Sequence, residues 1–227
     1  MKKIIIVFAL FAIGLSFSQE ANKSYYFDIV TTSYIKDYSN NVEGKRIRFQ
    51  NKEDDSYSMY IMITDSSKDA TLSDTKNRTL IKFDMDFEYQ SVEDLNKLDN
   101  SKLYSSIKYS KSRRYKNYVE DFDFERDSIS EKTIVHIIKY KNKKRKKIIS
   151  EHYYIFGKND GYNKNNPTLM KDYIFEKYNL KIAENKHLEK IIHLDKGKIS
   201  LETSNFVSET IDFNFEFTPL KISNQKY

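Results

Sequence analysis

Apolar and polar residues alternate with a period of two along much of this chain. In residues 79–88, every second residue from Ile81 onward is apolar (Ile81, Phe83, Met85 and Phe87), and the residues between them are charged. Because successive side chains of a β-strand point to opposite faces of a sheet, such a segment buries one face and exposes the other. The pattern therefore predicts a half-buried strand, of the kind found in antiparallel sheets with one solvated face.

The same alternation recurs along the rest of the chain. It predicts further strands over 25–35, 45–49, 57–64, 70–73, 102–109, 118–126, 132–139, 148–156, 188–194, 198–205 and 211–217. The segments between them are rich in Asn, Asp, Ser and Lys, and short turns of this kind favour hairpins. We expect a mainly all-β protein, with a single antiparallel meander sheet of about ten strands curled into a half-open barrel or a two-layer sandwich.

Two segments depart from this alternation. Residues 91–94 (Ser-Val-Glu-Asp) have the form of a capping box and predict a short helix over 91–98. Pro167 could open a second short helix over 168–178, although the spacing of apolar residues there is also compatible with a strand.

The N-terminus has the three parts of a secretory signal peptide. Lys2 and Lys3 precede an apolar run from Ile4 to Leu15, and residues 16–18 (Ser-Phe-Ser) place small residues before a cleavage site. The run is shorter than the roughly 20 residues that span a bilayer. We expect a signal peptide over 1–18, cleavage near Ser18–Gln19, and one exported β-rich domain over 19–227. Periplasmic residence and release from the cell both remain open, and we do not expect an integral membrane protein.

Composition excludes several kinds of chemistry. The 227 residues contain no Cys, so disulfides, thiolate metal sites and Cys nucleophiles are excluded. With 18 Tyr and 15 Phe, the core is expected to rely on aromatic packing. The net charge is +6, but Lys outnumbers Arg 32 to 7, so the dense arginine-bearing surface of a nucleic-acid binder is not expected.

No recognised catalytic motif is present, so the sequence favours a non-catalytic protein without a cofactor. Asp121, Asp123 and Glu125 alternate with Phe122 and Phe124, and we interpret these carboxylates as a solvated strand face rather than a catalytic pair. The sequence therefore predicts no catalytic residues.

The histidines offer one weak metal-binding hypothesis. If residues 132–140 and 148–156 pair symmetrically about Lys144, His136 lies opposite His152, whereas a shift of one residue pairs His136 with Glu151. No third ligand is evident, so no metal site is expected. His187 and His193 are six residues apart, which predicts one shared strand face.

A strongly basic segment covers residues 139–147 and predicts an exposed hairpin tip. Its core is Lys143, Lys144, Arg145, Lys146 and Lys147. This tip is either a solubilising turn that discourages edge pairing or a contact for an anionic surface. Lys111, Arg113, Arg114 and Lys116 form a second, smaller basic cluster.

These features favour an exported, non-catalytic binding or accessory protein of the cell envelope, with an apolar ligand held inside a curled sheet as one version. The partner is unknown; envelope lipid and envelope protein are the candidates. The alternatives are an extracellular hydrolase with an unrecognised site and an adaptor that binds anionic surfaces through the tip at 139–147.

Overall fold

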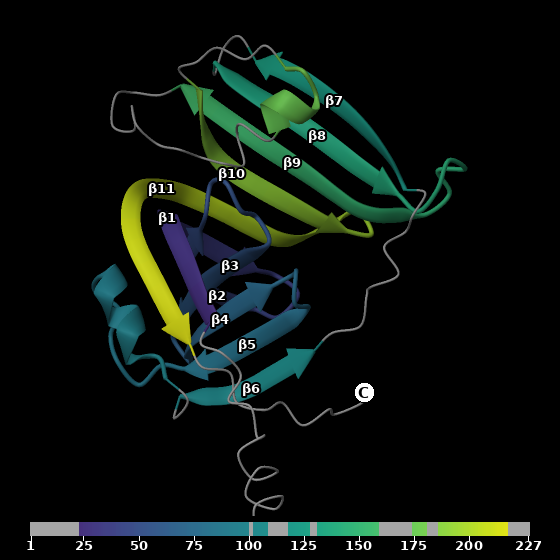
Figure 1. The fold of residues 1–227 in the computed structure, drawn as a ribbon. Helices are drawn as coiled ribbons and strands as arrows, with labels where there is room; N and C mark the ends of the chain where they lie inside the picture. The colour runs from purple at the N-terminus through teal and green to yellow at the C-terminus, as the bar shows by residue number, and fades with distance from the viewer. Residues whose placement is uncertain are drawn as a thin grey trace, which may run out of the picture.

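The computed structural model describes residues 23–99, 102–108, 118–127, 131–158, 174–180 and 186–217. Across these ranges, eleven strands form one antiparallel sheet, as Figure 1 shows. They are β1 (Lys23–Asp37), β2 (Val42–Gln50), β3 (Tyr57–Thr64), β4 (Lys68–Asp74), β5 (Thr79–Asp84), β6 (Leu103–Lys108), β7 (Val119–Asp127), β8 (Lys132–Tyr140), β9 (Ile148–Lys158), β10 (Lys186–Asp195) and β11 (Lys198–Phe217). The predicted all-β antiparallel class is confirmed.

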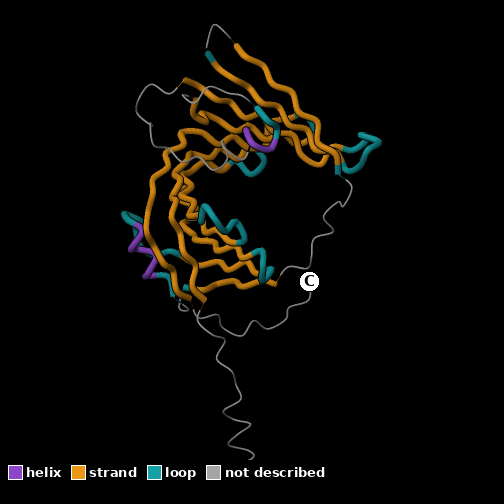
Figure 2. Tube along the Cα trace, turned by 45° about the horizontal axis from the view of Figure 1, so that its top comes forward, coloured by secondary structure: helices purple, strands orange, loops and turns teal. Residues whose placement is uncertain are grey.

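The first and last of these strands meet at the centre of the sheet. The strand order is β6-β5-β4-β3-β2-β1-β11-β10-β9-β8-β7, so a meander extends on each side of the β1–β11 pair. That pair runs antiparallel from Lys23 opposite Phe217 to Asp37 opposite Leu201. The strand order ends at β6 on one side and β7 on the other. Figure 2 shows the result as an open curl rather than a closed barrel.

The strand boundaries differ most from the sequence prediction at two places, and the other predicted bounds lie within three residues of the observed ones. Residues 198–205 and 211–217 belong to one continuous strand, β11, because β1 supplies a pairing partner along nearly its whole length. Shifts in register between Phe27 and Ile29 and between Thr32 and Tyr34 allow this long pair to bend. At the other boundary, β5 ends at Asp84 instead of continuing to residue 88.

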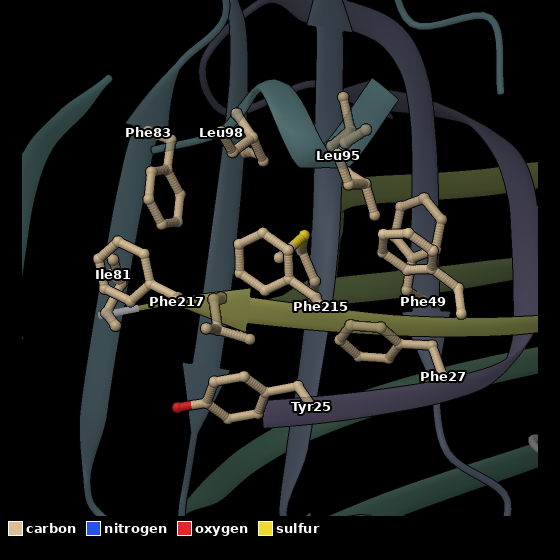
Figure 3. Close-up of a cluster of buried hydrophobic side chains, with 14 of the residues drawn as sticks. Tyr25, Phe27, Phe49, Ile81, Phe83, Leu95, Leu98, Phe215 and Phe217 are labelled. Atoms are coloured by element: carbon tan, nitrogen blue, oxygen red, sulfur yellow. The ribbon is translucent and has the colours of Figure 1, made fainter. Parts of the chain in front are cut away.

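The larger core lies against one face of the β1–β5 meander and is filled with side chains. Figure 3 shows rings from β1, β2, β5 and β11 converging with two leucines from the segment after β5. Phe27, Phe49 and Phe83 have no measurable exposure, and Phe215 is 1% exposed. We call this cluster core 1. Its aromatic content confirms the predicted reliance on ring packing.

A smaller cluster, core 2, lies on the opposite face of the same sheet. It is formed by Val135, Ile137, Phe156, Ile174, Leu188 and Phe206. Residues that pair across adjacent strands lie on the same face of a sheet. Successive pairs on the core 2 face link Ile35, Thr203, Ile191, Tyr154 and Val135. Phe49 of core 1 instead pairs with Val30, on the other face of β1. The sheet therefore buries one face in its first half and the other face in its second half.

The two short helical segments cover these two faces. The 3-10 helix η1 (Val92–Lys97) contributes Leu95 to core 1, and the Asp94 carboxylate accepts the backbone N–H of Ser91 at 3.0 Å. The predicted helix at 91–98 is thus confirmed as a 3-10 helix. Residues 174–177 form a helical turn that contributes Ile174 to core 2. Figure 2 shows the turn inside the curl and η1 outside it.

Several sequence predictions fall outside the described residues. These are the signal peptide at 1–18, the basic residues Lys111, Arg113, Arg114 and Lys116, and residues 168–173 of the second predicted helix. Among the residues that are described, no helix is both long enough and apolar enough to cross a membrane.

Candidate anion-binding site

The candidate site is a pair of arginines on β2. Alternation along this strand sends Ile47 and Phe49 into core 1, where they are 1% and 0% exposed. Arg46 and Arg48 consequently lie on the other face, the one that carries core 2 farther along the sheet. Two residues of a strand span about 7 Å, so the two side chains leave the sheet side by side.

Neutral residues surround this pair in the sheet register. The cross-strand partners of the two arginines are Ser33, Thr31, Met62 and Tyr60. Side chains directly opposite each other lie within about 5 Å at Cβ, so these are the nearest neighbours on the face. Ser33 is buried, and the Thr31 hydroxyl bonds the Ser208 hydroxyl at 2.8 Å. None of these neighbours carries a negative charge.

The two guanidinium groups are half-buried and have no counter-charge among the described residues. Burial lowers the pKa of both groups below its ordinary value, and for Arg46 the positive charge of Arg48 lowers the pKa further. The Arg46 Nε atom is buried without a hydrogen-bond partner among the described residues. Within the same residues, no carboxylate lies within 4.0 Å of either guanidinium. Native proteins pair buried polar groups, so the buried Arg46 Nε atom is an exception that marks this pair as a candidate site.

The acid on this face that is closest in register does not supply that partner. Asp69 pairs with Met62, which pairs with Arg46, so Asp69 stands two strands away, at a backbone distance of about 10 Å. Its carboxylate accepts the Thr71 hydroxyl at 3.5 Å. Burial raises the pKa of Asp69, and the nearby charge of Lys82 lowers it in part. Asp69 therefore lies too far from Arg46 in the register to neutralise it.

The histidines do not meet as the sequence suggested. His136 pairs with Tyr153, because the β8–β9 register is offset by one residue from symmetry about Lys144. Its ring stacks on Tyr153 at 4.1 Å, and its Nε2 atom lies 2.9 Å from Glu151 Oε1. His152 pairs instead with Ile137 and so lies on the opposite face from His136.

His152 contacts another histidine. Its ring stacks on His193 with centroids 4.4 Å apart. Burial lowers the pKa of His152 to about 4, and the neighbouring charges of His193 and Lys139 add to this effect. His187 does not share the face of His193, because a register shift lies between Leu188 and Lys190. In the described part of the chain, no group of three or more His, Asp or Glu residues is placed to hold a metal ion.

The predicted basic tip is the turn between β8 and β9. Residues 141–147 are all exposed, and they include the five predicted residues Lys143, Lys144, Arg145, Lys146 and Lys147. Arg145 binds the carboxylate of Asp121 at 2.7 Å. Within the described residues, the other four form no ion pair.

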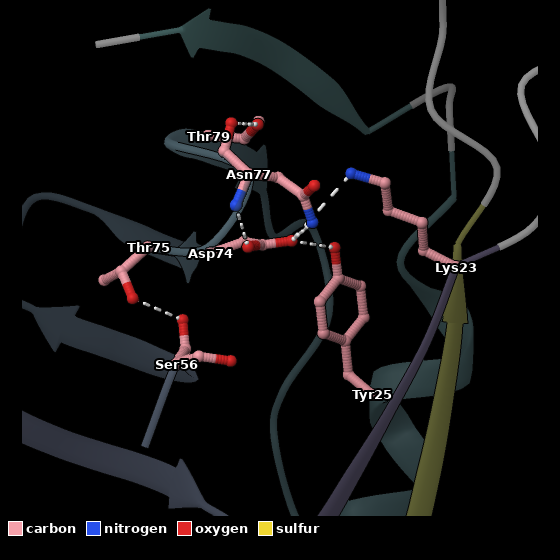
Figure 4. A network of polar contacts seen from close by, with 7 residues as sticks. All are labelled: Lys23, Tyr25, Ser56, Asp74, Thr75, Asn77 and Thr79. Carbon is pink, nitrogen blue, oxygen red and sulfur yellow. Dashed lines mark hydrogen bonds and ion pairs between the residues drawn. The ribbon is translucent and has the colours of Figure 1, made fainter. Parts of the chain in front are cut away.

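A separate polar recess of about 240 Å³ lies where β1 begins beside the β4–β5 turn. Figure 4 shows the polar contacts at this place, with Tyr25, Asn77 and Lys23 around Asp74. Asp74 is 3% exposed and accepts the Tyr25 hydroxyl at 3.1 Å. Asp74 also accepts the backbone N–H of Asn77 at 2.8 Å and its side-chain amide at 2.6 Å. Lys23 Nζ approaches the same carboxylate at 3.8 Å. Because these groups satisfy one another, we interpret the recess as a structural network that joins β1 to the β4–β5 turn.

Sequence reasoning did not single out Arg46 and Arg48. The available signal was the alternation in residues 45–49 (Lys-Arg-Ile-Arg-Phe), which places both arginines opposite two core residues. That alternation is equally typical of a solvated face, and the structure shows both arginines half-buried. Comparison with known proteins adds no assignment: no protein-family model matches the sequence, and a search of curated proteins returns no match.

Proposed function

We propose that this protein is an exported, non-catalytic binding protein of the cell envelope that holds the anionic group of a ligand on Arg46 and Arg48. The observation that carries the proposal is the pair of half-buried guanidinium groups on one face of β2, which have no carboxylate partner in the described residues and include the fully buried Nε atom of Arg46. A buried charge without a partner costs several kcal/mol, and a bound anion would offset that cost.

The chemistry of arginine narrows the class of ligand. A guanidinium presents a planar fork of donors that matches the two oxygens of a carboxylate or the oxygens of a phosphate. Two such forks lie side by side on β2, and Thr31 and Ser33 are paired directly opposite them on β1. This arrangement suits one oxyanion that accepts hydrogen bonds from both arginines and from a hydroxyl. The proposal concerns only the oxyanion of the ligand and assigns no other part of it. Core 1 is filled by its own side chains, so it does not supply the apolar part of a binding site.

Export rests on the sequence of residues 1–18, which lie outside the described part of the chain. Expression with this segment in a Gram-negative host, followed by mass measurement of the envelope fraction, tests it. We expect a chain that begins at Gln19. An uncleaved chain in the cytoplasm would contradict export without touching the anion site.

Ligand binding is tested with two simple probes, inorganic phosphate and octanoate, against chloride at equal ionic strength. The proposal expects at least one probe to raise the melting temperature in a saturable way. The double variant Arg46→Met and Arg48→Met should abolish that rise. Lys45→Met is the matched control, because it removes a charge from the same strand on the opposite face and should leave the rise intact.

Two results would contradict the proposal. One is the absence of a saturable effect from either probe on the unaltered protein. The other is an effect that persists in the double arginine variant, since the anion would then bind elsewhere.

A further inference from the structure

Three features of the second half of the sheet lie at the same end (Figure 1). Tyr140 pairs with both Val119 and Ile148, so the start of β7 lies beside the β8–β9 turn. Leu194 pairs with Glu151, so the β10–β11 turn lies at this end too, set back by about 10 Å. We call the turns 141–147 and 195–198, together with Tyr118, Ile148 and Ile199, the basic end.

The basic end carries a concentrated positive charge. Six of the seven residues in 141–147 are Lys or Arg, and none is acidic. Residues 195–198 add two lysines and one aspartate, all exposed. Apart from Arg145, which binds Asp121, and Lys141, the basic residues of these two turns form no ion pair in the described part of the chain. Their charge is therefore available to a partner.

Apolar side chains are also exposed at the basic end. Tyr118 is 47% exposed, Ile148 49% and Ile199 46%. Tyr118 also lies under the ammonium of Lys139 at 4.3 Å, which fixes its ring beside the tip. Tyrosine and aliphatic side chains interspersed with lysine are typical of surfaces that enter the headgroup layer of a bilayer.

We propose that the basic end docks the protein on a bilayer that contains anionic phospholipid. Negative headgroups complement the unpaired lysines, and the boundary between headgroups and acyl chains accommodates the tyrosine and the two isoleucines. A soluble polyanion would match the lysines but would leave the three apolar side chains in water. This proposal is independent of the anion site, because Arg46 and Arg48 lie on β2, outside the basic end.

Vesicle flotation tests the proposal with the mature chain. The probes are vesicles of phosphatidylcholine alone and vesicles in which about a third of the lipid is phosphatidylglycerol. We expect binding to the anionic vesicles only, and we expect it to weaken as ionic strength rises and the Debye length contracts. Equal binding to both vesicles, or binding that is insensitive to salt, would overturn the proposal.

Substitutions separate charge from apolar contact. The quadruple variant Lys143→Gln, Lys144→Gln, Lys146→Gln and Lys147→Gln should lower the partition coefficient on anionic vesicles by about a hundredfold or more at low salt. The triple variant Tyr118→Ser, Ile148→Ser and Ile199→Ser should lower it by about tenfold or more while binding to heparin stays unchanged. Circular dichroism confirms that each variant keeps its sheet.

The matched control removes exposed cations from the opposite end of the sheet, with Lys52→Gln, Lys76→Gln and Arg78→Gln. It should bind vesicles within about twofold of the unaltered protein. If this control loses as much binding as the quadruple variant, the attraction depends on net charge and the proposed surface is refuted. If the triple variant binds vesicles as well as the unaltered protein, the partner is a polyanion rather than a bilayer.

Discussion

Phe83 of β5 and Phe217 of β11 meet edge to face, with ring centroids 5.1 Å apart, although four strands separate them in the sheet order. The contact is possible only because the first half of the sheet curls until strands that are distant in the order approach each other. The contact between the two rings therefore depends on how the first half of the sheet bends and not on the pairing of adjacent strands.

Removing one of these rings tests how far the curl depends on core 1. Phe217 is 4% exposed, so Phe217→Ala should lower the free energy of unfolding by about 3–5 kcal/mol, through lost burial and the cavity that remains. Urea denaturation measures the change. On the same strand, Val207 is exposed, and Val207→Ala should change stability by about 0.5 kcal/mol or less. Equal losses in the two variants would show that the contact with Phe83 contributes nothing.

The arginine pair predicts an unusual effect on stability. Arg46→Met removes a desolvated charge that has no acidic partner in the described residues, so the ligand-free protein should become more stable by about 1–3 kcal/mol. A purely structural arginine would behave in the opposite way, because its loss would destabilise the fold. Urea titrations without added phosphate or carboxylate distinguish the two cases, with Lys45→Met as the reference for a charge lost from the other face.

The Asp74 network predicts an order of effects. Asp74→Ala leaves the Tyr25 hydroxyl and two N–H groups of Asn77 without their acceptor, which should cost about 2–4 kcal/mol. Tyr25→Phe removes one of those bonds and should cost about 1 kcal/mol. If thermal unfolding placed the two variants in the reverse order, Asp74 would not be the centre of the network.

His152 predicts a loss of stability in acid. Its pKa is about 4 in the fold and near 6.5 in an unfolded chain, so between these pH values the unfolded chain binds a proton that the fold does not. Its contribution is therefore complete above pH 6.5 and disappears as the pH falls to 4.

His152→Phe should reduce this acid sensitivity. The loss of stability between pH 7 and pH 4 should be smaller in the variant by about 1–2 kcal/mol, after allowing for solvent screening of a part-exposed ring. Urea denaturation at both pH values measures it. The prediction fails if both proteins lose the same stability across this range.

The strands could be predicted because alternation with a period of two is a local property of the sequence. Residues 57–64 show this most directly, since the predicted bounds are those of β3. Register is not local in the same way. The prediction for His136 and His152 depended on the centre of the β8–β9 turn, and an offset of one residue moved the two rings to opposite faces.

The candidate site could not be predicted from the sequence, for a related reason. Alternation places Arg46 and Arg48 on one face of β2, but it does not indicate whether water reaches that face. Their partial burial is a property of the folded sheet and not of the local alternation. The basic tip, by contrast, needed only a run of charges between two strands, and the structure places residues 141–147 of the predicted 139–147 in the β8–β9 turn, while Lys139 and Tyr140 end β8.

The central pairing of β1 with β11 has a consequence for biosynthesis. Ser24 and Asn214 contact each other across 190 positions of the chain, so the middle of the sheet cannot form until translation has nearly passed β11. Until then, β1 is an unpaired edge strand of the β1–β6 meander, and such an edge can pair with other chains. Nascent chains of this protein should therefore need a holding chaperone until synthesis ends, and truncation before β11 should yield aggregates rather than a stable half-domain.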